Sequence, residues 1–221
     1  MPRNLRLSAG GMVYHVLNRA NGRNRIFKTD KDYSDFLQLL GAASARSGTR
    51  LLAYCLMPNH WHLVLWPRLD GELSECLRWL TVTHTNRWHA SHGTTGTGSL
   101  YQGRFKSFPV QKGDPLWTVC RYVERNALRA KLVKKAEGWK WGSAYCIQQK
   151  NPDGLLSAGP EPRPDDWMKR VNQPQSEQEV LSLRNCVNRG CPYGSRLWVP
   201  QTVKKFGLES TLKPRGRPKS A

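Results

Sequence analysis

The sequence predicts an α+β protein built on a ferredoxin-like antiparallel sheet, with helices packed on one side of that sheet. Two observations lead to this fold class. Strand-like and helix-like stretches alternate in the order β-α-β-β-α-β before a further helix begins. The two central strands, over 50–56 and 60–66, are separated only by the short turn Met57-Pro58-Asn59, as in an antiparallel hairpin.

Residues that start and stop helices define the remaining elements. Thr29 or Asp30 is expected to cap the first helix, and Gly48 follows its end because glycine tolerates the left-handed backbone there. Asp70 is expected to cap the second helix. The other expected elements are a strand over 11–18, a basic loop over 19–25, helices through 36–43 and 73–80, a flexible loop over 93–99 and a strand over 105–110.

The helix that follows carries polar groups along the edge of its apolar stripe. Asp114 is the predicted N-cap and Pro115 lies in the first turn. Tyr122 and Asn126 are four residues apart, so they lie together, and Arg129 extends the row. The core-facing stripe comprises Leu116, Val119, Cys120, Val123, Ala127 and Ala130. The ordinary alternative is a tyrosine that packs its ring and keeps its hydroxyl in water.

The tripeptide His60-Trp61-His62 lies on the second strand of the hairpin. Alternate strand residues point to opposite faces, so His60 and His62 share one face and Trp61 takes the other. Two imidazoles that point the same way suit a divalent metal ion. The alternative is a pair of half-buried histidines with ordinary hydrogen bonds.

The composition points to a polyanionic partner. Lysine and arginine number 35 against 16 acidic residues, giving a formal charge of +19. Nucleic acid is the first candidate, and an anionic membrane is the alternative. No apolar run has membrane-spanning length and no signal peptide is visible, so a cytoplasmic protein that acts on the nucleoid is expected.

Other possible metal ligands receive ordinary structural interpretations. The six cysteines form no Cys-x-x-Cys pair and most sit in apolar patterns, which predicts buried, reduced thiols. His84, His89 and His92 lie near the end of a predicted helix and do not gather on one face. A solvated helix end is expected there, with a metal site as the alternative.

The C-terminal third differs in composition from the rest. We divide the chain into a main domain over 1–150, a proline- and glycine-rich linker or surface excursion over 151–175, and a helical extension over 176–221. Helices are expected over 176–189 and 195–206. Arg215-Gly216-Arg217-Pro218 resembles the core of an AT-hook, which inserts arginines into a narrow minor groove. A solvated basic tail explains these residues equally well.

Together these motifs resemble a known family. His60-Trp61-His62 is similar to the HUH motif, and Arg121-Tyr122-Val123-Glu124-Arg125-Asn126 is similar to the helix that carries a single nucleophilic tyrosine. The chain most resembles the REP-associated tyrosine transposases, from about Tyr14-His15-Val16 to Trp141-Gly142-Ser143, with Met57-Pro58-Asn59 and Tyr101 to Ser107 between. Ala127 departs from the pattern, since the family often has proline there.

The resemblance implies the HUH endonuclease fold and a mechanism. Tyr122 would attack a DNA phosphate to give a 5′-phosphotyrosine and a free 3′-hydroxyl, while His60, His62 and Asn126 hold Mg²⁺ or Mn²⁺. The implied substrate is single-stranded DNA with a hairpin, as in repetitive extragenic palindromes, bound by a monomer or homodimer. The basic residues expected to contact DNA are Arg104, Lys106, Arg121, Arg125, Arg129, Lys131, Arg215 and Arg217.

Two rival functions remain from the sequence. A sequence-specific DNA-binding protein on the same fold, without catalysis, would equally explain the charge and the tail. A metallohydrolase of small substrates would explain the histidines but neither the charge nor Tyr122. The combined presence of His60, His62, Tyr122 and Asn126 favours the enzyme.

Overall fold

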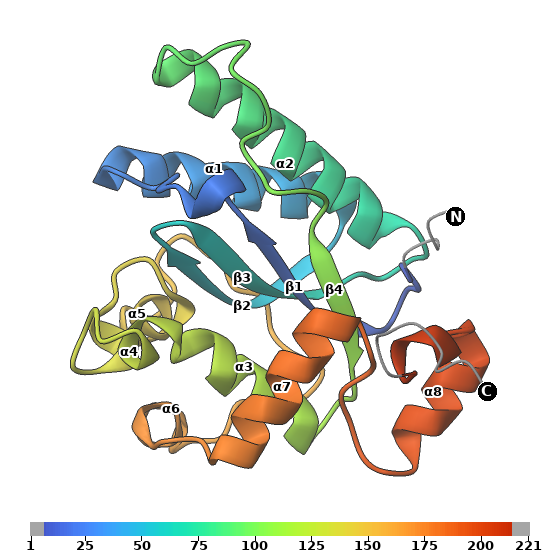
Figure 1. Ribbon diagram of the computed structural model, residues 1–221. Coiled ribbons are helices and arrows are strands. Elements are labelled where there is room, and N and C mark those ends of the chain that lie inside the picture. Colours follow the sequence, from blue (N-terminus) through green and yellow to red (C-terminus); the bar gives the residue numbers. More distant parts are fainter. Residues whose placement is uncertain (1–6, 214–221) are drawn as a thin grey trace.

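A computed structural model describes residues 7–213 and contains a four-stranded antiparallel sheet in the order β2-β3-β1-β4 (Figure 1). The order β-α-β-β-α-β confirms the predicted ferredoxin-like fold. The strands are β1 (Val13–Arg19), β2 (Arg50–Met57), β3 (His60–Trp66) and β4 (Lys106–Val110). The α-helices of the described chain are α1 (Asp30–Ser47), α2 (Glu72–Ser91), α3 (Asp114–Glu124), α4 (Asn126–Arg129), α5 (Ser143–Gln148), α6 (Trp167–Asn172), α7 (Glu177–Arg189) and α8 (Trp198–Phe206).

Strand β3 lies inside the sheet, between β2 and β1. The hairpin turn with β2 consists of Pro58-Asn59, and His60 pairs with Met57. On the other side, Leu17 of β1 lies opposite His62, and Arg19 lies opposite His60. The histidines of β3 are therefore flanked by backbone on both sides, which fixes the direction of their side chains.

The first helix begins and ends as the sequence predicts, but the second does not. Thr29 caps α1 through a reciprocal capping box with Asp32, and Gly48 ends it with a left-handed φ of 72°. The N-cap of α2 is Gly71, so the prediction for Asp70 was wrong. Asp70 instead accepts a hydrogen bond from the backbone N–H of Gly10, at 2.7 Å, and so holds the segment that enters β1.

Helices α1 and α2 cover one face of the sheet (Figure 1). Trp61, Leu63 and Leu65 of β3 are buried in this layer, as the alternation of strand residues predicted. His84 of α2 is also buried there, and its Nδ1 lies 2.7 Å from the Tyr101 hydroxyl. The prediction of a solvated helix end was therefore wrong for His84, because the apolar face of α2 extends beyond Leu80 to this residue.

The opposite face is covered by α3 and the C-terminal helices, so the prediction of helices on one side only was incomplete (Figure 1). Leu52, Cys55 and Met57 of β2 point to this second layer, and Leu51, Tyr54 and Leu56 point to the first. Because both alternating sets are buried, both faces of the sheet require a cover.

Helix α3 differs from its prediction at both ends. Its N-cap is Gly113, so the prediction of Asp114 as the N-cap was wrong, while Pro115 lies in the first turn as predicted. The helix ends at Glu124, and a separate short helix, α4, follows Arg125. The predicted continuous helix through Ala130 is thus broken between the tyrosine and the asparagine.

A buried carboxylate fixes α3 to the chain that follows it. Glu124 accepts hydrogen bonds from the hydroxyl of Ser143 and the indole N–H of Trp167, both at 2.7 Å. The guanidinium of Arg163 lies 3.2 Å away and pairs with the same carboxylate. A buried charge that is paired and fully hydrogen-bonded is costly to disrupt, so these contacts hold the tyrosine helix in place.

The C-terminal part contains the expected helices and two that the sequence did not reveal. Helix α7 begins with a capping box at Ser176, and α8 begins at Trp198, three residues later than expected. Helices α5 and α6 have six residues each, too few to show a helical period. The segment 151–166 is irregular, as expected, and the division of the chain into domains stays a prediction.

Two further findings concern cysteines and membranes. All six cysteines are buried and free, as predicted, and the sulfurs of Cys186 and Cys191 lie 3.3 Å apart. Between residues 7 and 213, no helix is long and apolar enough to cross a membrane.

Candidate active site

One cavity of about 260 Å³ brings together the polar residues that the sequence singled out. It lies at one end of β1 and β3, between the sheet, the tyrosine helix and α7. Its lining residues are Leu17, Arg19, His60, His62, Tyr122, Asn126, Arg129, Arg184, Val187 and Asn188. Residues from four separate parts of the chain thus converge on a single pocket.

The two histidines of β3 are adjacent and held in defined orientations. Their ring centroids are 5.1 Å apart. His60 donates from Nδ1 to Oδ1 of Asn59 at 2.7 Å, and Nδ1 of His62 lies 2.9 Å from Nε2 of His15. These bonds occupy Nδ1 of both rings and leave Nε2 as the nitrogen available to an ion.

Burial keeps the histidine cluster neutral. It lowers the pKa of His15 to about 3 and that of His60 to about 4, with Arg19 and Arg129 adding to the effect at His60. Burial, with the neighbouring His15 and His60, places the pKa of His62 well below its usual value. Neutral imidazoles are the form that binds metal ions.

Tyr122 occupies the last turn of α3 and lies beside this cluster. Its ring meets His62 edge-on, with centroids 6.0 Å apart and an interplanar angle of 81°. The guanidinium carbon of Arg129 lies 4.3 Å from the centre of the tyrosine ring. Within the described chain, Nη1 of Arg129 is buried without a hydrogen-bond partner. A positive group with a free donor therefore lies next to the phenol.

Asn126 bridges the broken helix. Its Nδ2 donates to the carbonyls of Tyr122, at 3.2 Å, and Val123, at 3.0 Å, which satisfies acceptors at the end of α3. Its Oδ1 accepts a hydrogen bond from Nη2 of Arg129. The carboxamide thus couples the position of the tyrosine to that of the arginine.

The residues present fit a divalent ion. His60 and His62 offer neutral Nε2 donors, and Oδ1 of Asn126 keeps a second lone pair besides the one used by Arg129. No group of three or more histidine, cysteine or acidic residues among residues 7–213 is arranged to hold a metal. An ion bound to this donor set would rely on water or phosphate oxygens for its remaining ligands.

The basic residues expected to contact DNA fall into four groups. Arg129 lines the pocket, while Arg104 and Lys106 are exposed at the start of β4, and Lys131 is exposed after α4. Arg121 and Arg125 instead donate to backbone carbonyls of Pro174 and Val171, and so anchor the end of α6. The two arginines of the AT-hook-like motif, Arg215 and Arg217, lie outside the described residues.

Three ionisable residues of the pocket or the histidine cluster were not foreseen as part of the site. His15 is buried and orients His62, Arg19 lies opposite His60 in the sheet, and Arg184 reaches the pocket from α7. Arg19 and His15 follow a period of two along β1, but only the pairing of β1 with β3 shows that they meet the histidines. No signal in the sequence pointed to Arg184.

The sequence matches the profile of a transposase family described as IS200-like, over residues 8–126, more than half of the chain. The chain belongs to the IS200-like transposase family. This match covers the sheet, both histidines of β3, Tyr122 and Asn126. No curated protein matches the sequence.

A solved structure has the same fold. A REP-associated tyrosine transposase bound to a REP hairpin is 16% identical, with a TM-score of 0.54, over 75% of this chain and 95% of that chain. A proposed transposase from Deinococcus radiodurans is also 16% identical and covers 71% of this chain and 100% of that one, but its TM-score of 0.41 carries no weight. The first likeness establishes that this IS200-like transposase shares the fold of REP-associated enzymes.

Proposed function

We propose that the protein is a metal-dependent single-stranded DNA endonuclease and strand transferase that acts at hairpin-containing, REP-like sequences. The observation that carries this proposal is the convergence of His60, His62, Tyr122 and Asn126 on one pocket. Membership of a transposase family supports it, as does the hairpin bound by the structurally similar enzyme. We place its action on the nucleoid, as a monomer or homodimer.

Tyr122 is the proposed nucleophile. Its Oη would bond to phosphorus as the P–O3′ bond breaks, the phenolic proton being lost and the 3′-oxygen taking up a proton. The product is a 5′-phosphotyrosine and a free 3′-hydroxyl, and attack by a 3′-hydroxyl reverses the step to rejoin strands. A free phenol has a pKa of roughly 10 and is a weak nucleophile at neutral pH. Arg129, whose guanidinium carbon lies 4.3 Å from the centre of the tyrosine ring, would offset negative charge on the attacked phosphate.

His60, His62 and Asn126 are the proposed metal ligands. A divalent ion bound there would polarise the scissile phosphate, a contribution worth several kcal/mol. Mn²⁺ accepts imidazole more readily than Mg²⁺ does, so we expect it to support activity at least as well.

The basic surface is the proposed DNA-binding surface. Between Arg104 and Lys135 there are nine basic and two acidic residues. Arg104, Lys106 and Lys131 are exposed in this stretch and available to phosphates. Nη1 of Arg129, which has no hydrogen-bond partner among residues 7–213, is the group we expect to contact the phosphate nearest Tyr122.

Incubation of the full chain with labelled hairpin oligonucleotides and Mn²⁺ tests the proposal. We expect a covalent protein–DNA adduct that resists denaturant, is lost in Tyr122→Phe and persists in Tyr145→Phe. Tyr145, on α5, is the matched control because it lies outside the pocket. An undiminished adduct in Tyr122→Phe would remove Tyr122 as the nucleophile. Tight hairpin binding with no adduct for any oligonucleotide would favour the alternative, a DNA-binding protein without catalysis.

A further inference from the structure

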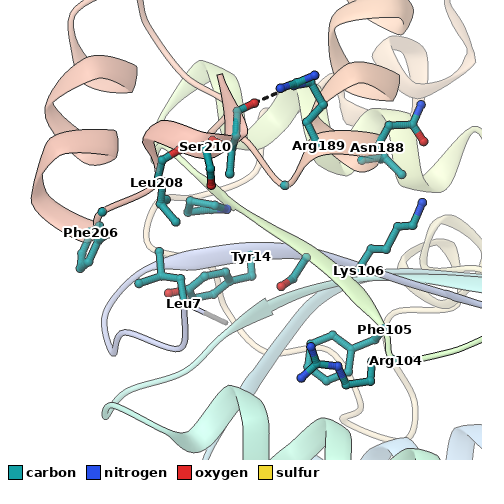
Figure 2. Close-up of a pocket in the computed structure, with 16 residues that line it drawn as sticks. Leu7, Tyr14, Arg104, Phe105, Lys106, Asn188, Arg189, Phe206, Leu208 and Ser210 are labelled. Atoms are coloured by element: carbon teal, nitrogen blue, oxygen red, sulfur yellow. Dashed lines mark hydrogen bonds between the residues drawn. The ribbon is translucent and has the colours of Figure 1, made fainter. Parts of the chain in front are cut away.

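The candidate active site opens into a groove that follows β4 towards the C-terminal helices. We call the β4–α7 groove the run of three adjoining cavities that begins at the Tyr122 pocket. A second cavity, of about 260 Å³, shares Leu17, Arg19, Val187 and Asn188 with that pocket. A third, of about 740 Å³, shares Val187, Asn188, Arg104 and Lys106 with the second (Figure 2). The shared walls make these cavities one path.

The β4–α7 groove is lined by positive charge along its whole length. Its basic residues are Arg19, Arg104, Lys106, Arg129, Arg184 and Arg189. No aspartate or glutamate is among the described residues that line the three cavities. A concave surface with one sign of charge concentrates ligands of the opposite sign, here a row of phosphates.

The wide end also offers apolar surface. Phe206, Leu208 and Leu7 line it and are only partly buried (Figure 2). Arg189 is held at the rim, because its Nε donates to the carbonyl of Thr211 at 2.7 Å. Aromatic and apolar side chains beside arginine suit unpaired bases, which stack on them while their phosphates contact the cations. A duplex hides the faces of its bases and could use only the charges.

The helices that form one wall of the β4–α7 groove lie outside the part of the chain that matches the family profile. Helix α7, helix α8 and the turn at Glu209–Thr211 all lie after residue 126, where the family match ends. Helix α7 ends with its C-cap Gly190, whose left-handed φ of 74° turns the chain. This turn leaves the rim residues beside β4.

We propose that the β4–α7 groove binds a single-stranded segment of the DNA substrate, continuous with the phosphate that Tyr122 attacks. This inference rests on the proposed function for the identity of the substrate. The charged part of the groove holds the sugar-phosphate backbone, and the wide end holds at least one unpaired base against Phe206. The C-terminal extension thereby contributes to substrate choice.

The test compares two double variants with equal loss of charge. Arg104→Gln with Lys106→Gln removes two groove cations that are exposed and have no side-chain hydrogen bond or ion pair among residues 7–213. Arg78→Gln with Arg87→Gln is the control, on exposed positions of α2 at the opposite face of the sheet. Affinity is measured on an unstructured single strand, a blunt hairpin and hairpins with single-stranded extensions of increasing length.

We expect the groove variant to lose affinity for the single strand and for the extended hairpins, with little change on the blunt hairpin. Its slope of log affinity against log salt on single strands should fall by about 1.4, as two lost phosphate contacts require. The control variant should match the wild type. Phe206→Ala should weaken single-strand binding about fivefold or more, and Phe206→Tyr should restore it.

Two results would overturn the inference. One is equal single-strand affinity in the groove and control variants, and the other is an equal loss on the blunt hairpin, which would indicate a general phosphate surface. Adduct formation is scored separately on the same substrates. A groove-dependent affinity for single strands without any adduct would reject the proposed chemistry while retaining the groove. An adduct without groove dependence would reject only the groove.

Discussion

The two faces of the sheet each bury a histidine beside a tyrosine, yet only one pair is suited to chemistry. On the α1–α2 face, the Tyr101 hydroxyl lies 2.7 Å from Nδ1 of His84 and accepts the indole N–H of Trp61 at 3.0 Å. On the α3 face, Tyr122 contacts His62 inside a pocket. The bond to His15 uses Nδ1 of His62 and leaves its Nε2 for a ligand. A histidine–tyrosine pair becomes a candidate site when it lines a cavity with unused donors and acceptors.

The largest expected effect is a loss of activity that distinguishes the His62–Tyr122 pair from the His84–Tyr101 pair. His60→Ala or His62→Ala should reduce the rate of adduct formation on the order of a hundredfold or more, because several kcal/mol of assistance to the reacting phosphate would be lost. Activity should fall far more than stability or hairpin affinity does. Asn126→Ala should be milder, since water can replace an amide oxygen. His84→Gln, assayed under conditions where it is folded, is the matched control, and a similar loss there would break the distinction.

Stability should show the opposite pattern. Tyr101→Phe removes the partner of both His84 and Trp61 in a fully buried setting. Each buried group left unsatisfied costs about 1–3 kcal/mol of unfolding free energy. Urea unfolding should therefore show a clear destabilisation, with adduct formation by the folded fraction unchanged. Tyr122→Phe should unfold close to the wild type; a larger destabilisation there than in Tyr101→Phe would contradict the assignment of roles.

His15 sharpens the comparison, because it supports a candidate ligand without lining the pocket itself. His15→Phe keeps a ring in place but removes the bond to Nδ1 of His62. Loss of such a supporting bond typically costs about 10–100-fold in metal affinity or activity. We expect a shift of that size in the Mn²⁺ concentration needed for half-maximal adduct formation, with recovery at high Mn²⁺. Phe108→Leu, which alters packing on the other side of His15, should not shift it.

The structural histidine should appear in the pH dependence of stability. Burial lowers the pKa of His84 from 6.5 to about 4. As the pH falls below 6.5, His84 binds a proton in the unfolded chain but not in the folded chain. The free energy of unfolding therefore falls until about pH 4. One such group contributes about 1.4 kcal/mol per pH unit. In urea titrations, His84→Gln should be less sensitive to pH than the wild type in this window by about that amount; an unchanged slope would show that His84 does not titrate in this way.

The smallest effect on catalysis is expected from the basic tail, which carries none of the proposed catalytic groups. Deleting 213–221 removes Lys213, Arg215, Arg217 and Lys219. If all four contact phosphates, the slope of log affinity against log salt should fall by about 3 on single strands or 4 on duplex. A greater loss on AT-rich than on GC-rich flanks would indicate minor-groove insertion. Equal affinities and slopes before and after deletion would leave the tail as solvated charge, and cleavage of a short hairpin should change little throughout.

Periodic patterns and terminal signals in the sequence determined the main elements. The alternation of β3 placed His60 and His62 on one face, and the capping box at Thr29 fixed the start of α1. The spacing of Tyr122 and Asn126 brought them together even though the helix breaks between them, because Arg125 keeps a helical backbone conformation. These are local properties, and local sequence is enough to set them.

Only the tertiary structure decided which of these residues share a pocket. The pairing of β1 with β3 brings His15 and Arg19 beside the histidines of β3. Helix α7, more than a hundred residues after β3 in the sequence, contributes Arg184. Glu124, the last residue of α3, is a buried carboxylate that binds Ser143 and Trp167, partners that only folding brings near. The β4–α7 groove likewise exists because distant segments pack side by side. Contacts between residues far apart in sequence depend on how the layers pack, and no local pattern encodes that.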